Sequence, residues 1–337
     1  LTATAQVEGP LDEVRLRAAL DAVVARHEIL RTRIEFVSGL DLPMQFIADP
    51  GGQAAIALHV RALPHGRHEI RLETTCLHVD EESCGWILEE LAAAYAGESL
   101  GEEAPIQYAD YARWALDALE KPEGEAGRHF WASFVDFTEA ATTETARDEA
   151  SLSCELDTVL DETSLLTVWA ILCGAIAGEP RVLMAVRGSG RQLRELARAV
   201  GVFERWLPVE LALDERASFQ AQCDDVARRV EDGRQHQDYW PATTAIHAGV
   251  GFRYVGARSA GAWSVRTVSS PGAPCGLALT VGAGQARLTY ARGAWSAAAA
   301  ARLLDQYRTL VGAAAGCAGA TPWRRWTVGP APVQPAA

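Results

Sequence analysis

The chain has 337 residues, of which 49% are hydrophobic, and its formal net charge is −13. This length is enough for one large domain or for two domains of ordinary size, each with its own core. The acidic balance argues against nucleic-acid partners, because phosphate binding needs clustered cations and the arginines form no run.

Other global features exclude several protein classes. No window approaches the run of about 18 apolar residues that a membrane span needs, and residues 1–17 lack the basic and apolar regions of a signal peptide. We therefore expect a cytoplasmic protein with no membrane partner. Seven scattered cysteines, with no CxxC pair and no Cys/His cluster at zinc spacing, predict neither a disulfide framework nor a metal site.

The first half of the chain predicts helices that pack on a sheet. Residues 11–27 carry apolar side chains at the spacing of a helix face, and a strand should follow over residues 29–37. Residues 56–79 alternate as two paired strands with a turn at 64–66. Ser83 is a candidate N-cap for a helix that stops at Gly97, and residues 108–119 predict another helix.

The second half shows a similar order of elements. A helix that is apolar on nearly every side covers residues 164–179, and a strand follows at 181–186. Further helices are predicted over 217–235 and 297–315, with strands at 250–256 and 286–293. The polar stretch 138–151 is the best candidate linker. We therefore predict two α/β (α+β) lobes, 1–145 and 146–327, followed by a flexible tail, 328–337.

Six phrases in order resemble the condensation domains of nonribosomal peptide synthetases. They are EGPLD, ALDAVVARHEILRTRI, PIQYADYARW with FW at 130–131, VLMAVRGSGR, VGVFERWLPVEL and HQDYWP. The resemblance implies that the catalytic motif falls within TTCLHVDEESCGW, residues 74–86. Domains of this family usually carry one further strand and helix before the point where this chain starts. His27 and His236 lie in phrases that look structural.

The resemblance implies a specific architecture and reaction. Two chloramphenicol-acetyltransferase-like lobes would form a V-shaped pseudo-dimer with a central tunnel. Donor and acceptor carrier proteins would bring acyl or peptidyl thioesters on 4′-phosphopantetheine to the two mouths of this tunnel, and the domain would bind no cofactor of its own. Adjacent synthetase domains are the other partners that it implies.

The family motif, His-His-x-x-x-Asp-Gly, is broken here and allows two registers. The gapless register places Thr75 and Cys76 on the histidines, Asp80 on the aspartate and Ser83 on the serine that follows. The second register makes His78 the second histidine and Glu82 the aspartate, at the expense of a two-residue deletion. We favour the gapless register, because the deletion would rotate the following helix by about 200° and lose its buried face.

The candidate catalytic residues are Cys76 and His78. An imidazole can accept a proton near neutral pH, whereas a thiol with a reference pKa of about 8.5 is a poor base there. On an extended segment 74–80, His78 would share a face with Cys76 and Asp80 and could serve as a displaced base. The alternative for His78 is a structural histidine bonded to a neighbouring carboxylate.

The resemblance also implies a structural pair and a set of lining residues. Asp80 would pair with Arg191, which ends the Gly-Arg strand. Substitutions at the phrases near the tunnel predict a narrowed or redirected passage. The residues expected to line it are Thr75, Ser83, Arg205, Trp206, Cys275 and Gly276.

Three functions stay open from the sequence. The first is a noncanonical condensation domain that transfers a carrier-bound acyl group to an amine or another nucleophile. The second is an inactive condensation-like domain that docks carrier proteins or recruits a tailoring enzyme. The third is cyclisation or dehydration of a carrier-bound chain.

Overall fold

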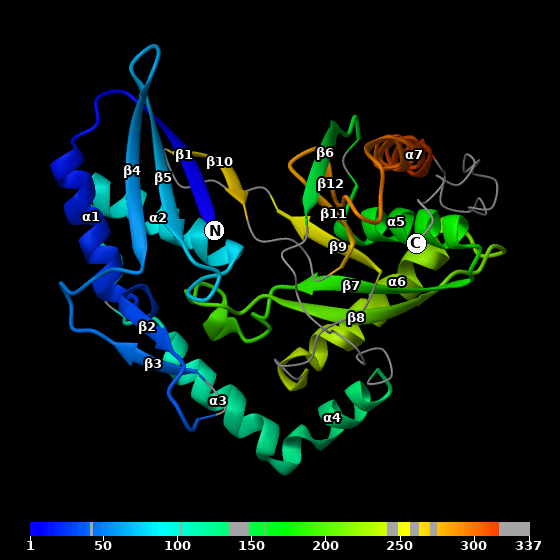
Figure 1. Cartoon of the computed structure of the whole chain (residues 1–337), viewed down its shortest axis with the longest axis horizontal. Helices are drawn as coiled ribbons and strands as arrows, with labels where there is room; N and C mark the ends of the chain where they lie inside the picture. The colour runs from blue at the N-terminus through cyan, green and yellow to red at the C-terminus, as the bar shows by residue number, and fades with distance from the viewer. Residues whose placement is uncertain are drawn as a thin grey trace. The chain divides into compact units, whose positions relative to one another are not determined.

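The computed structural model describes residues 1–40, 43–101, 103–134, 148–158, 160–240, 249–256, 263–269 and 275–316. The predicted domain limits at residues 145 and 327, and the predicted tail, lie outside these residues and stay predictions. The described chain forms two compact units, coloured along the sequence in Figure 1. The first contains residues 1–121, 189–204 and strand β10; the second contains the other described elements.

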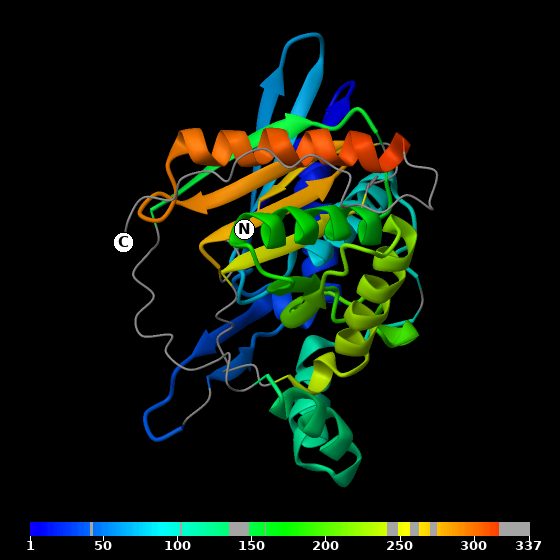
Figure 2. The ribbon, with the colours of Figure 1, turned by 90° about the vertical axis from the view of Figure 1, so that its right-hand side faces the viewer.

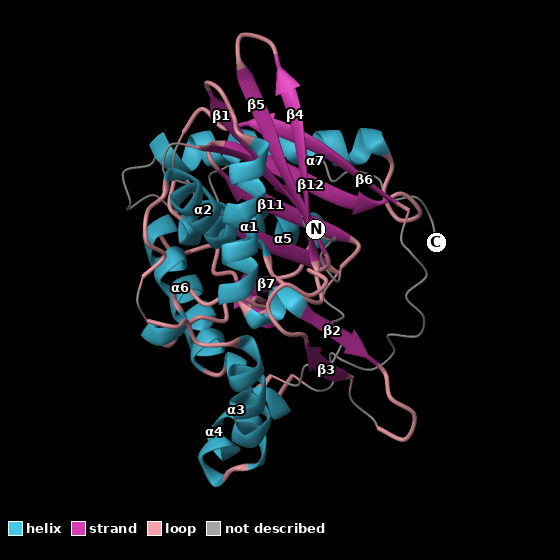
Figure 3. Ribbon diagram, turned by 90° about the vertical axis from the view of Figure 1, so that its left-hand side faces the viewer, coloured by secondary structure: helices cyan, strands magenta, loops and turns pink. Residues whose placement is uncertain are grey.

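The first unit is built on a four-stranded antiparallel sheet with the order β10-β1-β5-β4. Its helices α1 and α2 lie side by side and share a core with the sheet (Figure 3). A separate hairpin pairs β2 with β3. The elements are β1 Thr2–Glu8, α1 Glu13–Arg26, the 3-10 turn Glu28–Arg31, β2 Thr32–Glu35, β3 Met44–Ile47, β4 Ile56–Leu63, β5 Arg67–Thr74, α2 Glu81–Ala96, α3 Tyr108–Glu120, the 3-10 turn Arg194–Leu196 and β10 Ser264–Ser269.

The second unit is built on a six-stranded mixed sheet with the order β6-β12-β11-β9-β7-β8. Helices α5, α6 and α7 contribute to one core with this sheet, and Figure 2 shows α5 and α7 running alongside it. The elements are the 3-10 turn Pro122–Gly124, α4 Glu125–Ala132, β6 Glu149–Glu155, α5 Glu162–Ala177, β7 Arg181–Gly188, β8 Arg205–Ala212, α6 Phe219–Gln235, the 3-10 turn Gln237–Tyr239, β9 Val250–Val255, β11 Leu277–Gly282, β12 Gln285–Ala291 and α7 Ala297–Gly316.

The structure confirms the predicted helices. The features that mark a helix in the sequence lie within the helix or at its two ends, so they could be recognised without the rest of the fold. Helix α1 buries the predicted stripe, and Asp12 caps its start by accepting hydrogen bonds from the amides of Val14 and Arg15. Helix α2 ends at Gly97, whose φ of +85° is in the left-handed region that favours glycine. The mixed α/β fold class is likewise confirmed.

Several local predictions are wrong. Residues 28–31 form a 3-10 turn, so the strand predicted over 29–37 is limited to β2. Residues 149–151 of the predicted linker belong to β6, where they pair with β12. The N-cap of α2 is Asp80 rather than Ser83, because the Asp80 carboxylate accepts from the Ser83 amide.

Candidate functional site

A tight turn separates β5 from α2 in the first unit. Strand β5 ends at Thr74, and the Thr75 carbonyl accepts from the amides of His78, at 3.1 Å, and Val79, at 3.4 Å. The prediction of an extended segment over residues 74–80 is therefore wrong. The turn breaks the strand spacing that would have set Cys76 and His78 on one face, and Cys76 is exposed.

The His78 imidazole is held by hydrogen bonds at both nitrogens. Nε2 lies 2.8 Å from the Thr32 carbonyl oxygen, and Nδ1 lies 2.7 Å from Thr75 Oγ1. A carbonyl only accepts, so Nε2 carries the proton, and Nδ1 of the neutral ring accepts from the Thr75 hydroxyl. The predicted carboxylate partner is replaced by a backbone carbonyl. Thr75 itself is exposed, so its hydroxyl is the accessible end of this chain of hydrogen bonds.

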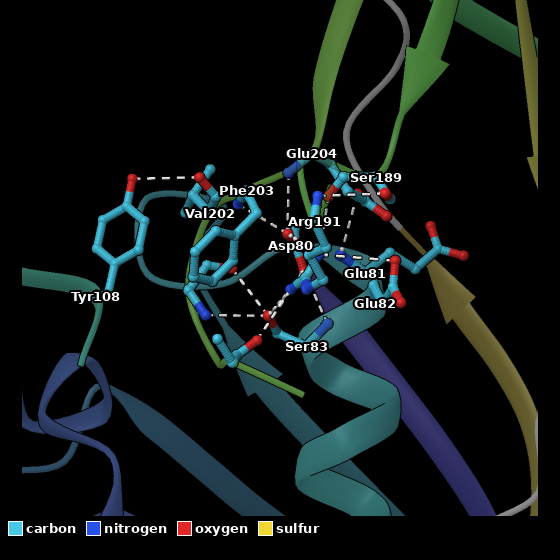
Figure 4. A network of polar contacts seen from close by, with 12 residues as sticks. Asp80, Glu81, Glu82, Ser83, Tyr108, Ser189, Arg191, Val202, Phe203 and Glu204 are labelled. Atoms are coloured by element: carbon cyan, nitrogen blue, oxygen red, sulfur yellow. Dashed lines mark hydrogen bonds and ion pairs between the residues drawn. The ribbon is translucent and has the colours of Figure 1, made fainter. Parts of the chain in front are cut away.

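Asp80 and Arg191 form a buried bidentate ion pair in the first unit (Figure 4). Arg191 Nη1 lies 2.9 Å from Asp80 Oδ2, and Nη2 lies 3.0 Å from Oδ1. The side chains are 2% and 1% exposed, so solvent screens this pair very little. Glu82 is farther from the guanidinium, at 3.6 Å, and its side chain is 22% exposed. Asp80 is therefore the carboxylate nearest to Arg191, and the register of the motif stays a prediction.

The pair also fixes the backbone of residues 199–204. Asp80 Oδ2 accepts from the amides of Phe203, at 2.8 Å, and Glu204, at 3.0 Å. Arg191 Nη2 donates to the Ala199 carbonyl at 3.1 Å, and the guanidinium lies over the Phe203 ring, 4.6 Å from its centroid. The network therefore ties three stretches of chain together: the start of α2, residue 191, and residues 199–204.

Ser83 completes this network. Its hydroxyl donates to the Gly201 carbonyl at 2.8 Å and accepts from the Gly201 amide and from Arg191 Nη2. The residue is completely buried, so its oxygen is committed to the network. Sequence reasoning did not include Gly201, Phe203 or Glu204 here, because backbone donors leave no mark on residue identity.

No protein-family model matches the chain. It is 26% identical over 282 residues to tyrocidine synthase 2 of Brevibacillus parabrevis, covering 69% of this chain and 8% of the relative. It is 34% identical over 181 residues to CymA of Salinispora arenicola, which is named a probable non-canonical nonribosomal peptide synthetase. This match covers 43% of this chain and 2% of CymA. The chain thus spans a small part of the length of these relatives.

Solved structures match over nearly the whole chain. The first condensation domain of the calcium-dependent antibiotic synthetase superposes with a TM-score of 0.80 at 15% identity, over 97% of this chain and 94% of that one. The X-domain from teicoplanin biosynthesis superposes with a TM-score of 0.74 at 20% identity, over 97% of this chain and 92% of the X-domain. The chain has a condensation-domain fold. The curated relatives agree, since they are nonribosomal peptide synthetases.

The remaining residues expected to line the tunnel of the condensation-domain fold belong to the second unit. Arg205 Nη1 donates to the Trp240 carbonyl at 3.2 Å, and Trp206 lies under the Arg187 guanidinium, 5.3 Å from its ring centroid. Cys275 is buried and Gly276 is partly buried. Their place along a tunnel stays a prediction, as do the tunnel and the V shape.

The two other histidines of the condensation-domain phrases have structural contacts. His27 is buried at the end of α1, with Nε2 at 2.6 Å from Glu90 Oε2 of α2. The His236 ring packs on Phe130, and its carbonyl accepts from Trp131 Nε1 at 2.7 Å. Over the described part of the chain, no group of three or more His, Cys, Asp or Glu side chains could hold a metal ion. None of the described helices is long and apolar enough to cross a bilayer.

The ion pair gives the condensation-domain fold a pH-dependent element. Burial raises the pKa of the Asp80 carboxyl, but the Arg191 charge and hydrogen bonds from Arg191 and Ser83 more than offset burial, so this pKa lies below its ordinary value. Such a carboxyl stabilises the fold fully above its unfolded pKa of about 3.9. The contribution is lost as the pH falls through the folded pKa.

We therefore predict that Arg191→Met destabilises the protein less in acid than at neutral pH. The difference in free energy of unfolding between wild type and variant should be largest near neutral pH and should shrink as the pH falls. It shrinks first as the unpaired Asp80 of the variant, whose pKa burial raises, takes up a proton, and ends as Asp80 of the wild type is protonated. Urea unfolding at each pH measures it. A difference that did not change with pH would show that the Asp80 charge does not carry the effect.

Proposed function

We propose that the chain is a noncanonical condensation domain that transfers an acyl or peptidyl group from a carrier-bound thioester to an amine, or another nucleophile, on a second carrier or a free acceptor. The synthetase relatives and the condensation-domain fold support this proposal. The observation that carries it is the Thr75–His78–Thr32 chain of hydrogen bonds, directly before the buried Asp80–Arg191 pair. It offers an imidazole that can accept a proton, two residues after Cys76, the position that the gapless register aligns with the second motif histidine.

The proposed reaction forms a C–N bond and breaks a C–S bond. The amine nitrogen attacks the thioester carbonyl carbon, its proton passes to the Thr75 hydroxyl, and the hydroxyl proton passes to His78 Nδ1. The resulting imidazolium returns the proton by the same route to the leaving thiolate. The Thr32 carbonyl holds the reactive tautomer, because it accepts a hydrogen bond from Nε2–H throughout the reaction.

The Asp80–Arg191–Ser83 network has a positioning role in this proposal. It fixes the start of α2 and the backbone at Gly201, Phe203 and Glu204, and so limits movement of the turn that carries Thr75 and His78. Orientation of two tethered substrates supplies much of the acceleration, and a positioned base adds about 10²–10⁴-fold. Loss of the motif histidines is therefore compatible with turnover.

The substrates in this proposal are thioesters on the 4′-phosphopantetheine of a donor and an acceptor carrier protein. Adjacent synthetase domains are the further partners, and the domain needs no resident cofactor. Cys76 is an exposed neighbour of Thr75, not the nucleophile. The place of action is the cytoplasm.

A docking function is the second candidate. The X-domain from teicoplanin biosynthesis, which shares this fold, has been solved in complex with OxyB; that complex matches this chain with a TM-score of 0.72 at 20% identity. In this alternative the chain binds carrier proteins or a tailoring enzyme and forms no bond.

Intact-mass analysis of loaded carrier proteins separates the two functions. The chain is incubated with a panel of donor and acceptor carriers, each loaded with an acyl or aminoacyl group. For an enzyme, the donor loses the acyl mass and the acceptor gains it, faster than in a mixture without the chain. Carrier binding with no transfer across the whole panel would refute the enzyme and leave docking.

A further inference from the structure

Gln237 has a buried polar side chain whose amide finds no hydrogen-bond partner in the described part of the chain. It lies in the 3-10 turn after α6, and the residue is 1% exposed. Both Oε1 and Nε2 are buried, and neither has a hydrogen-bond partner among the described residues. Because a buried unsatisfied amide costs stability, such a group needs a reason other than the fold.

Gln222 of the same unit shows the usual arrangement. It is 2% exposed, its Oε1 accepts from the Asp214 amide at 3.0 Å, and its Nε2 donates to the Ala212 carbonyl at 2.7 Å. These two hydrogen bonds within the fold explain why a glutamine is buried at position 222. Gln237 has the same side chain and the same burial without either bond.

The Gln237 backbone is held by hydrogen bonds that leave the side-chain amide unsatisfied. Arg205 Nη1 lies 3.4 Å from the Gln237 carbonyl oxygen, and the Trp240 amide donates to that oxygen at 3.2 Å. A Cβ on Gly188 would lie only 3.0 Å from Gln237 Oε1, so the glycine leaves room for this oxygen. Gln237 thus lies beside Gly188 and Arg205, where the chain leaves the second unit and re-enters it.

We propose that the Gln237 side chain is a substrate contact that binds a secondary amide. An amide ligand offers one N–H and one C=O, which pair with Oε1 and Nε2 together and satisfy both buried atoms at once. The proposal rests on the proposed function for the source of the amide, which is the pantetheine arm of a carrier. It concerns binding alone and does not require transfer.

The test compares Gln237→Leu with the matched control Gln222→Leu. An apolar side chain of similar size at 237 removes two unsatisfied polar atoms, so the melting temperature should stay the same or rise by about 2–4 °C. At 222 the change leaves two backbone groups unpaired, and the melting temperature should fall by about 4 °C or more. Gln237→Met repeats the measurement with an unbranched side chain.

Binding of pantetheine is then measured by ligand-observed NMR titration. Two neutral hydrogen bonds are at stake, so Gln237→Leu should raise the Kd about 10-fold, while Gln222→Leu that remains folded should leave it unchanged. A fall in melting temperature for Gln237→Leu as large as that for Gln222→Leu would show that the amide has a partner within the fold. Absence of pantetheine binding in the wild type, or an unchanged Kd in Gln237→Leu, would refute the proposal that Gln237 binds a pantetheine amide. Neither result depends on whether product forms in the carrier assay.

Discussion

Replacing Arg191 with alanine should lower the free energy of unfolding by about 3–5 kcal/mol. The change leaves the Asp80 carboxylate without its counter-ion in a place where the side chain is 1% exposed. It also removes donors from the Ser83 hydroxyl and from the Ala199 carbonyl. The loss therefore combines an unpaired buried charge with unsatisfied polar groups.

Arg198→Ala is the matched control for this measurement. Arg198 also binds a carboxylate, that of Glu89, at 2.8 Å, but its side chain is 60% exposed. Solvent screens such a pair, so the loss there should be at most about 1 kcal/mol. Urea unfolding followed by tryptophan fluorescence gives both values. Equal losses in the two variants would mean that burial does not set the strength of the Asp80–Arg191 pair.

The helices could be predicted from sequence because each carries its own signal. The apolar stripe of α1 and the left-handed glycine at the end of α2 act within one or two turns. Strands β1 and β10 of the first sheet carry no comparable signal. Strand β1 buries the small side chains of Ala3 and Ala5 and pairs with β10, which lies more than 250 residues later in the chain. Only the folded chain supplies that partner.

The candidate site shows the same difference between what the sequence predicts and what only the folded chain reveals. The pairing of Asp80 with Arg191 could be expected only from the family resemblance, because 111 residues separate the two. The turn at 75–78 was missed because β-forming residues before it suggested a continuing strand, whereas hydrogen bonds to the Thr75 carbonyl and hydroxyl close the turn. The Thr32 carbonyl that orients His78 is a backbone group, and no residue type announces it.

His78→Ala should reduce acyl transfer between loaded carriers by about 10²–10⁴-fold if the imidazole is the base. Thr75→Val should cause a similar loss, because the proposed route to Nδ1 passes through the Thr75 hydroxyl, 2.7 Å away. Thr75→Ser keeps a hydroxyl and should restore most of the rate. Cys76→Ala should have a mild effect, since the exposed thiol has no part in this route. Single-turnover mass measurements with the same donor and acceptor give all four rates.

The pattern of the four variants separates the proposed relay from its competitors. A relay requires that His78→Ala and Thr75→Val lose rate together and that Thr75→Ser does not. If the turn is merely structural, His78→Ala should lower the melting temperature, and the transfer rate of the protein that stays folded should keep the pH dependence of the wild type. If His78 is the base, the pH dependence of the transfer rate should change when it is replaced. A large loss in Cys76→Ala, with an acyl adduct on that residue, would replace the relay with a covalent thiol mechanism. Full rates in every variant would assign the acceleration to tethering alone, because no side chain of the turn would then take the proton.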